Sequence, residues 1–166
     1  MTYMTDAPTA EHPVPMSGQG HGYDAPAGLS SGQYRLRRFG GRPIVFQGTE
    51  LAMAMSFTPG LPYWFEINLF RANDGSCPVC VKKFFSSSEE KDFARAWVAP
   101  SIEAALDSIE TFDPAEDVPV RVSLSGGSMT PAEMEAAAMD LQAQVTNVRT
   151  HYASLVGEFL HQLDAA

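Results

Sequence analysis

The chain has 166 residues, of which 45% are hydrophobic and 19% are charged, and this globular composition excludes a wholly disordered chain. Two cysteines are too few for a disulfide scaffold, and no apolar run is long enough to span a membrane. The net charge of −9 argues against passive binding to nucleic acid or anionic lipid, so we expect neither a membrane nor a nucleic acid as a direct partner.

Residues 1–33 are expected to form a disordered N-terminal tail. They are rich in glycine and proline, and Val14 and Leu29 are their only residues of the Ile, Leu, Val and Phe types. So few apolar side chains bury too little surface to offset the entropy lost when a chain becomes ordered. The first basic residue is Arg35 and no apolar block precedes it, so we expect no secretory signal and a cytoplasmic protein.

The next part of the chain predicts short antiparallel strands. Two strands are expected at 34–39 and 42–47, on either side of a Gly-Gly turn. A third is expected at 50–57, beyond Gly48, because large apolar residues there alternate with small or polar ones.

Residues 63–71 and 77–85 predict a β-hairpin around an Asn-Asp-Gly turn. Pro78 lacks a backbone N–H, which favours a four-residue loop at 73–76 and places the second strand at a sheet edge or beside a bulge. The expected register pairs Phe65 with Phe84, Leu69 with Cys80 and, on the outer side, Glu66 with Lys83.

A further strand is expected at 92–99, followed by a helix over 101–112 that Ser101 caps. Val118 to Leu124 is expected to form another strand. Residues 125–129 then predict a flexible Ser/Gly linker.

The strongest local signal predicts a long helix within residues 130–166. Thr130 is a suitable N-cap, Pro131 suits the first helical position, and Glu133 completes a capping box. From Met134 onward, apolar residues recur in a heptad pattern, which favours a coiled coil and most simply a homodimer. A helix folded back over its own domain shows similar spacing and remains the alternative. The expected interaction seam comprises Leu141, Val145, Val148, Tyr152, Leu155 and Phe159.

Two clusters of charged residues are candidate docking surfaces. The basic cluster could bind phosphate or an acidic partner, or it could simply protect an edge strand from aggregation. The acidic cluster could engage a cation or a basic partner, or it could be a solvated helix face. The clusters comprise Arg35, Arg37, Arg38 and Arg42, and Glu103, Asp107 and Glu110.

The string Cys77-Pro-Val-Cys80 resembles, over four residues, the redox motif of glutaredoxin-like proteins. That resemblance implies a reactive thiolate at the start of a helix. Because residues 81–85 read as strand, we interpret both cysteines as structural, one on each face of the sheet. No phosphate-binding loop, zinc-protease motif or nucleophile elbow occurs, so no catalytic, cofactor or metal-binding residue is assigned.

These signals predict an α+β fold: a small antiparallel sheet of about five short strands with a short helix in residues 34–124, then one long C-terminal amphipathic helix. The expected function is a non-enzymatic interaction or regulatory module that self-associates or docks through this helix. Two alternatives remain: an acidic inhibitor or nucleic-acid mimic that binds a basic site on a partner, and an enzyme with an unrecognised site near Cys77 and Cys80.

Overall fold

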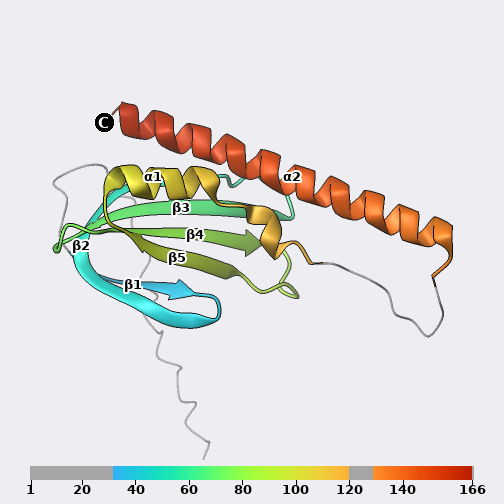
Figure 1. Ribbon diagram of the computed structural model, residues 1–166, viewed down its shortest axis with the longest axis horizontal. Helices are drawn as coiled ribbons and strands as arrows, with labels where there is room; N and C mark the ends of the chain where they lie inside the picture. Colours follow the sequence, from blue (N-terminus) through green and yellow to red (C-terminus); the bar gives the residue numbers. More distant parts are fainter. Residues whose placement is uncertain (1–31, 120–128, 166) are drawn as a thin grey trace, which may run out of the picture.

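The computed structural model describes residues 32–119 and 129–165. In these ranges a five-stranded antiparallel sheet carries a short helix and a long C-terminal helix on one face, which is the expected α+β class (Figure 1). Residues 1–31 of the expected tail, and residues 120–128 of the expected strand and linker, lie outside the described residues. Gly32 and Gln33, the last two residues of the expected tail, belong instead to the first strand and pair with Gly48 and Gln47. In chain order the elements are β1 (Gly32–Arg38), β2 (Gly41–Met55), β3 (Tyr63–Ala72), β4 (Cys77–Phe85), β5 (Phe93–Ala99), α1 (Ile102–Thr111), the 3₁₀ turn η1 (Pro114–Asp117) and α2 (Pro131–Asp164).

β2 is one continuous strand, so the expectation of two strands separated at Gly48 is wrong. Gly48 pairs with Gly32 of β1 on one side and with Ala72 of β3 on the other. A Cβ atom at this position would lie 2.1 Å from the carbonyl oxygen of Arg71. The glycine therefore permits a close approach of two strands and does not interrupt the sheet.

A register irregularity in β2 decides which of its side chains face the core. The pairing with β3 shifts between Glu50 and Ala52, and Ala54 beyond the shift is buried. Met53 and Met55, which the alternating pattern picks out, are each 38% exposed. Because small residues face inward here, α2 can pack closely on β2.

The β3–β4 hairpin is confirmed, but its register differs by one residue from the expected one. The amide of Ala72 donates to the carbonyl of Ser76 (2.9 Å), which leaves three residues in the connection, and Gly75 adopts a φ of 86°. A three-residue connection of this kind ends on a residue in the left-handed region, which glycine supplies without strain. The observed register pairs Phe65 with Lys83, Glu66 with Lys82 and Leu69 with Val79.

Pro78 lies in a central strand, so the expectation of a sheet edge or a bulge is wrong on both counts, because neither ladder of β4 shifts register. β4 pairs with β3 on one side and β5 on the other. The ladder to β3 ends at Val79, one residue short of Pro78, which suits a residue that has no backbone N–H to donate.

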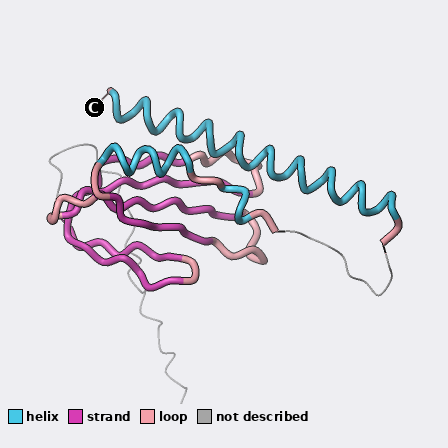
Figure 2. Tube along the Cα trace, viewed as in Figure 1, coloured by secondary structure: helices cyan, strands magenta, loops and turns pink. Residues whose placement is uncertain are grey.

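Both faces of the curled sheet are covered, as the trace in Figure 2 shows. The helices cover one face. On the other face, β1 and the start of β2 curl over the sheet, and the amide of Phe39 donates to the carbonyl of Ala94 in β5 (2.8 Å). A second, smaller core therefore forms on the face away from the helices, around Leu36, Phe70, Cys80 and Ala96.

The expected helix caps are confirmed. The side chain of Ser101 accepts a hydrogen bond from the amide of Ala104 at the start of α1. At the start of α2, the Thr130 hydroxyl accepts from the amide of Glu133, whose carboxylate accepts from the amide of Thr130 (2.8 Å). Each pair satisfies backbone donors that have no partner inside the helix. Val118 and Pro119 belong to no strand, so the expected strand does not begin there.

α2 runs unbroken past the sheet, and only its C-terminal half is buried (Figure 1). That half packs on β2, β3 and α1, and the Tyr152 hydroxyl donates to the carbonyl of Ile109 (3.0 Å). The N-terminal half projects beyond the sheet, where Met134 is 52% exposed and Met139 is 66% exposed. The side chains of α2 that are buried in the core are Val148, Tyr152, Leu155, Val156 and Phe159.

An ion pair anchors α2 where it meets η1. The Arg149 guanidinium donates to the Asp113 carboxylate (Nε to Oδ1, 3.0 Å), and the same carboxylate accepts from the amide of Ala115. The hydrogen bonds from Arg149 and Ala115 lower the pKa of Asp113 from 3.8 to about 2. The stabilisation is therefore complete above pH 4 and is lost as the pH falls through 2.

We expect Asp113→Asn to lower the free energy of unfolding by less than about 1 kcal/mol at neutral pH, because the pair is largely solvent-exposed. The difference from the wild type should shrink as denaturant titrations move from neutral pH toward pH 2. Arg149→Gln, which removes the partner, should show the same trend. A difference that stays constant over this pH range would contradict a role for the Asp113 charge.

Candidate functional site

The candidate site is built around Lys83, near the end of β4. Successive residues of a strand point to opposite faces, so the hairpin register places Lys83 under α2 and Lys82 on the other face. Lys82 there binds Glu66 through its amino group (2.6 Å), whereas Lys83 is only 4% exposed. The expected outer pair of Glu66 with Lys83 is therefore wrong, because the connection before β4 is one residue shorter than expected.

Four aromatic rings surround the amino group of Lys83. Its Nζ lies 4.6 Å from the ring centroid of Tyr63, 5.1 Å from that of Phe85, 5.7 Å from that of Phe65 and 5.8 Å from that of Phe93. At these distances the ring faces stabilise a cation. Within residues 32–119 and 129–165, no hydrogen bond or ion pair reaches this amino group.

The charge on Lys83 is only partly balanced by its surroundings. Burial lowers the pKa of Lys83, and the nearby carboxylates of Asp117 and Glu90 oppose this effect. Asp117 is itself engaged, because it accepts a hydrogen bond from Nε of Arg95 (3.2 Å). The site is therefore a buried amine whose charged form is stabilised by the surrounding aromatic rings and by these two carboxylates.

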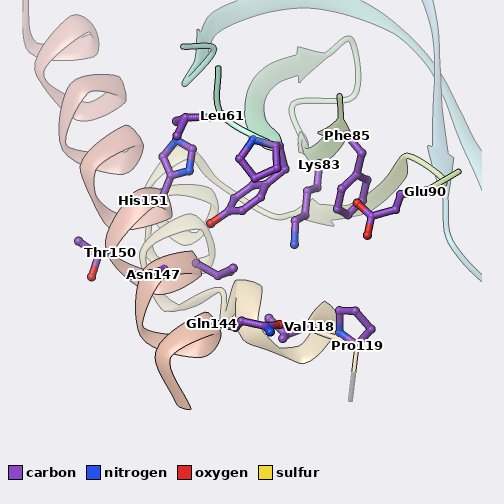
Figure 3. Close-up of a pocket in the computed structure, with 13 residues that line it drawn as sticks. Leu61, Lys83, Phe85, Glu90, Val118, Pro119, Gln144, Asn147, Thr150 and His151 are labelled. Atoms are coloured by element: carbon purple, nitrogen blue, oxygen red, sulfur yellow. The ribbon is translucent and has the colours of Figure 1, made fainter. Parts of the chain in front are cut away.

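A cavity of about 670 Å³ borders Lys83 between the sheet and the middle of α2 (Figure 3). Polar side chains line the α2 wall, and His151 on that wall packs against the ring of Tyr63 in a tilted arrangement, with 5.4 Å between the ring centroids. The remaining walls are mainly apolar. The polar residues of the α2 wall are Gln144, Asn147, Thr150 and His151, and the apolar lining includes Leu61, Pro62, Phe85, Val118, Pro119 and Val148.

These features match the general character of a small-molecule site. The volume falls within the range of about 300–1,000 Å³ that is usual for ligand pockets, and a few polar groups stand in an apolar lining. A single buried amine can hold an anionic group. The part of the chain that the structure describes contains no group of three or more His, Cys, Asp or Glu residues placed to hold a metal ion.

The two cysteines lie on opposite faces of β4, and both are buried. Burial raises the pKa of Cys77 and raises that of Cys80 to about 11. A reactive thiol needs a lowered pKa, so these surroundings disfavour a thiolate at neutral pH. Neither cysteine lines the cavity around Lys83.

The two charged clusters stay apart from this cavity. All four arginines of the basic cluster are exposed, three on β1 and Arg42 at the start of β2, and Nε of Arg38 donates to the carbonyl of Arg42 (2.9 Å). The three acidic residues are exposed along α1. No member of either cluster lines the cavity around Lys83.

The structure divides the expected interaction seam of α2 between two environments. Leu141 and Val145 are half-buried, near the point where the helix leaves the sheet. The other four residues lie in the protein's own core, namely Val148, Tyr152, Leu155 and Phe159. Their packing corresponds to the alternative in which the helix folds back over its own domain.

Sequence reasoning missed Lys83 and the aromatic rings around it. The visible signal was a lysine followed by two phenylalanines near the end of a strand. That signal becomes informative only when the register places Lys83 on the face beneath α2.

Among the described residues, no helix is both long and apolar enough to cross a membrane. In comparisons with known proteins, no family model matches the chain, and it matches no curated protein and no solved structure.

Proposed function

We propose that this protein is an interaction module that self-associates through the projecting N-terminal half of α2. The observation that carries the proposal is an apolar stripe that continues beyond the sheet. Its members keep the heptad spacing of the buried half, yet Met134 and Ala138 are exposed where the helix extends past the strands that the structure describes (Figure 1). We call this the projecting stripe; it comprises Met134, Ala138, Leu141 and Val145.

A second copy of the chain can cover this stripe. In an antiparallel pair with its two-fold axis between Met139 and Asp140, Met134 lies opposite Val145 of the partner and Ala138 lies opposite Leu141. Each layer then joins two apolar side chains, and the interface is self-complementary, as a two-fold dimer requires.

Charge supports the antiparallel orientation. Glu133 and Glu135 lie in the first turns of α2, and residues 131–147 contain no lysine or arginine. A parallel pair would place these acidic turns side by side, whereas an antiparallel pair separates them along the helix. Residues 131–147 span about 25 Å at 1.5 Å per residue, so the interface is short and the dimer should dissociate on dilution.

We expect Ala138→Asp to abolish self-association, because it places a charge in the centre of the stripe twice per dimer. Ala136→Asp is the matched control, since both alanines are exposed on the same stretch of helix and only Ala138 belongs to the stripe. Sedimentation equilibrium over a series of concentrations should show a dimer for the wild type and for Ala136→Asp, and a monomer for Ala138→Asp. Because both positions are exposed, the two variants should melt alike at protein concentrations too low for association.

Two results would reject the proposal. One is a wild-type protein that stays monomeric at high micromolar concentration. The other is an equal loss of association in Ala136→Asp, which would show that charge anywhere on the helix, and not the stripe, controls the association.

A further inference from the structure

The amino group of Lys83 has hydrogen-bonding capacity that the described structure leaves unused. An ammonium carries three N–H donors, and the aromatic rings around Lys83 stabilise its charge without accepting conventional hydrogen bonds. An apolar side chain of similar length would fill the same space without the cost of burying a charge. Core packing alone therefore does not account for a lysine at this position.

The unused donors face the cavity. In Figure 3 the nitrogen of Lys83 points into the space between α2 and the segment that contains Val118 and Pro119. Lys83 as a whole is 4% exposed, so a group that enters this space would meet an amine that is largely shielded from bulk water. Electrostatic attraction and hydrogen bonding are stronger in such surroundings than at the surface.

We propose that the cavity binds a small organic monocarboxylate, with its carboxylate on Nζ of Lys83 and its apolar body against apolar lining residues such as Leu61, Phe85 and Val118. The amides of Gln144 and Asn147 on the α2 wall stand at the same cavity and can donate to further oxygen atoms of the ligand. This binding is independent of self-association through the projecting stripe.

The charges around the cavity favour a ligand with one negative charge over a ligand with two. Glu90 lines the cavity, and the carboxylate of Asp117 acts on Lys83 from η1. Both acidic groups repel an incoming anion. Among the described residues that line the cavity, Lys83 is the only lysine or arginine, so a single positively charged side chain faces the ligand there. A phosphate monoester, which carries close to two negative charges at neutral pH, should therefore bind more weakly than a carboxylate on the same apolar body.

The test uses the full-length protein and defined probes. Isothermal titration calorimetry would compare 2-naphthoate, the uncharged 2-naphthamide, 2-naphthyl phosphate and the aliphatic monocarboxylate decanoate. We expect at least one of the two monocarboxylates to bind. If the cavity accepts an aromatic ligand, 2-naphthamide and 2-naphthyl phosphate should each bind at least about tenfold more weakly than 2-naphthoate. If decanoate binds and 2-naphthoate does not, the cavity prefers a carboxylate with an aliphatic chain.

Two neighbouring lysines provide matched variants. Lys83→Met replaces the apolar stem of the side chain with one of the same length but removes the terminal amino group, and it should weaken binding of the monocarboxylate at least about tenfold. Lys82→Met makes the same change on the opposite face of β4, and it should leave the affinity unchanged. Thermal melts of both variants would confirm that they fold.

A third variant keeps the proposal testable even if Lys83→Met fails to fold. Asn147 is exposed on α2 and lines the cavity, so Asn147→Trp should occupy the space and reduce binding without removing the amine. The proposal is overturned if neither monocarboxylate binds the wild type, if 2-naphthamide binds as tightly as 2-naphthoate, or if Lys82→Met and Lys83→Met weaken binding equally.

Discussion

Replacement of Phe159 by alanine is expected to lower the free energy of unfolding by about 3–5 kcal/mol. Phe159 is 0% exposed and belongs to the main core, where the C-terminal half of α2 meets the sheet. Truncation removes most of its apolar surface and leaves a cavity that close-packed neighbours fill only in part. Urea titrations followed by circular dichroism would measure the loss.

Met139→Ala on the same helix is the control for this prediction. Met139 is 66% exposed on the projecting half, and alanine is the better helix former, so its replacement should change the stability by no more than a few tenths of a kcal/mol. A loss below about 1 kcal/mol for Phe159→Ala would contradict the burial of this half of α2. Comparable losses at both positions would mean that the two halves of the helix are equally buried.

Gly48→Ala is expected to destabilise the protein by about 3 kcal/mol, at the upper end of the usual cost of overpacking. The added methyl group would lie 2.1 Å from the carbonyl oxygen of Arg71 and 2.8 Å from Cα of Ala72. Both atoms belong to the backbone of β3, so the contact cannot be relieved by a side-chain rotation. The strands must separate, which weakens the hydrogen bonds between β2 and β3.

The same substitution at Gly157 should have the opposite sign. No atom lies within 4 Å of the site where its Cβ would stand, and the residue is exposed in the interior of α2. Gly157→Ala should therefore stabilise the protein by about 0.5–1 kcal/mol, because alanine loses less backbone entropy in a helix. A stabilising effect of Gly48→Ala in the same denaturation assay would contradict the close approach of β2 and β3.

Features that depend on nearby residues were predictable from the sequence. The capping box at Thr130, the cap at Ser101 and the turn around Gly75 each arise from a few adjacent side chains and their hydrogen bonds to the backbone. The α+β class follows from the same local periodicities. The length of α2 follows from a run of strong helix formers without an internal proline.

The candidate site was not predictable because one residue in a turn decides which lysine is buried. Both Lys82 and Lys83 suit a half-buried strand, and local propensity does not distinguish them. The three-residue connection before β4 turns Lys83 toward α2 and Lys82 toward Glu66. The cavity itself also requires the position of α2, more than 60 residues later in the chain.

The amino-acid sequence by itself determined that α2 is a long helix with one apolar stripe. It did not determine what covers that stripe, because heptad spacing is the same for a helix on its own sheet and for a helix against another chain. Only the tertiary structure decided that Val148, Tyr152, Leu155 and Phe159 lie in the core and that Met134 and Ala138 project beyond it. The physical reason is length: α2 has 34 residues and spans about 51 Å at 1.5 Å per residue. β3, with 10 residues, spans about 33 Å, and the longer β2 curls over the other face of the sheet, so the part of the sheet under α2 ends before the helix does (Figure 1).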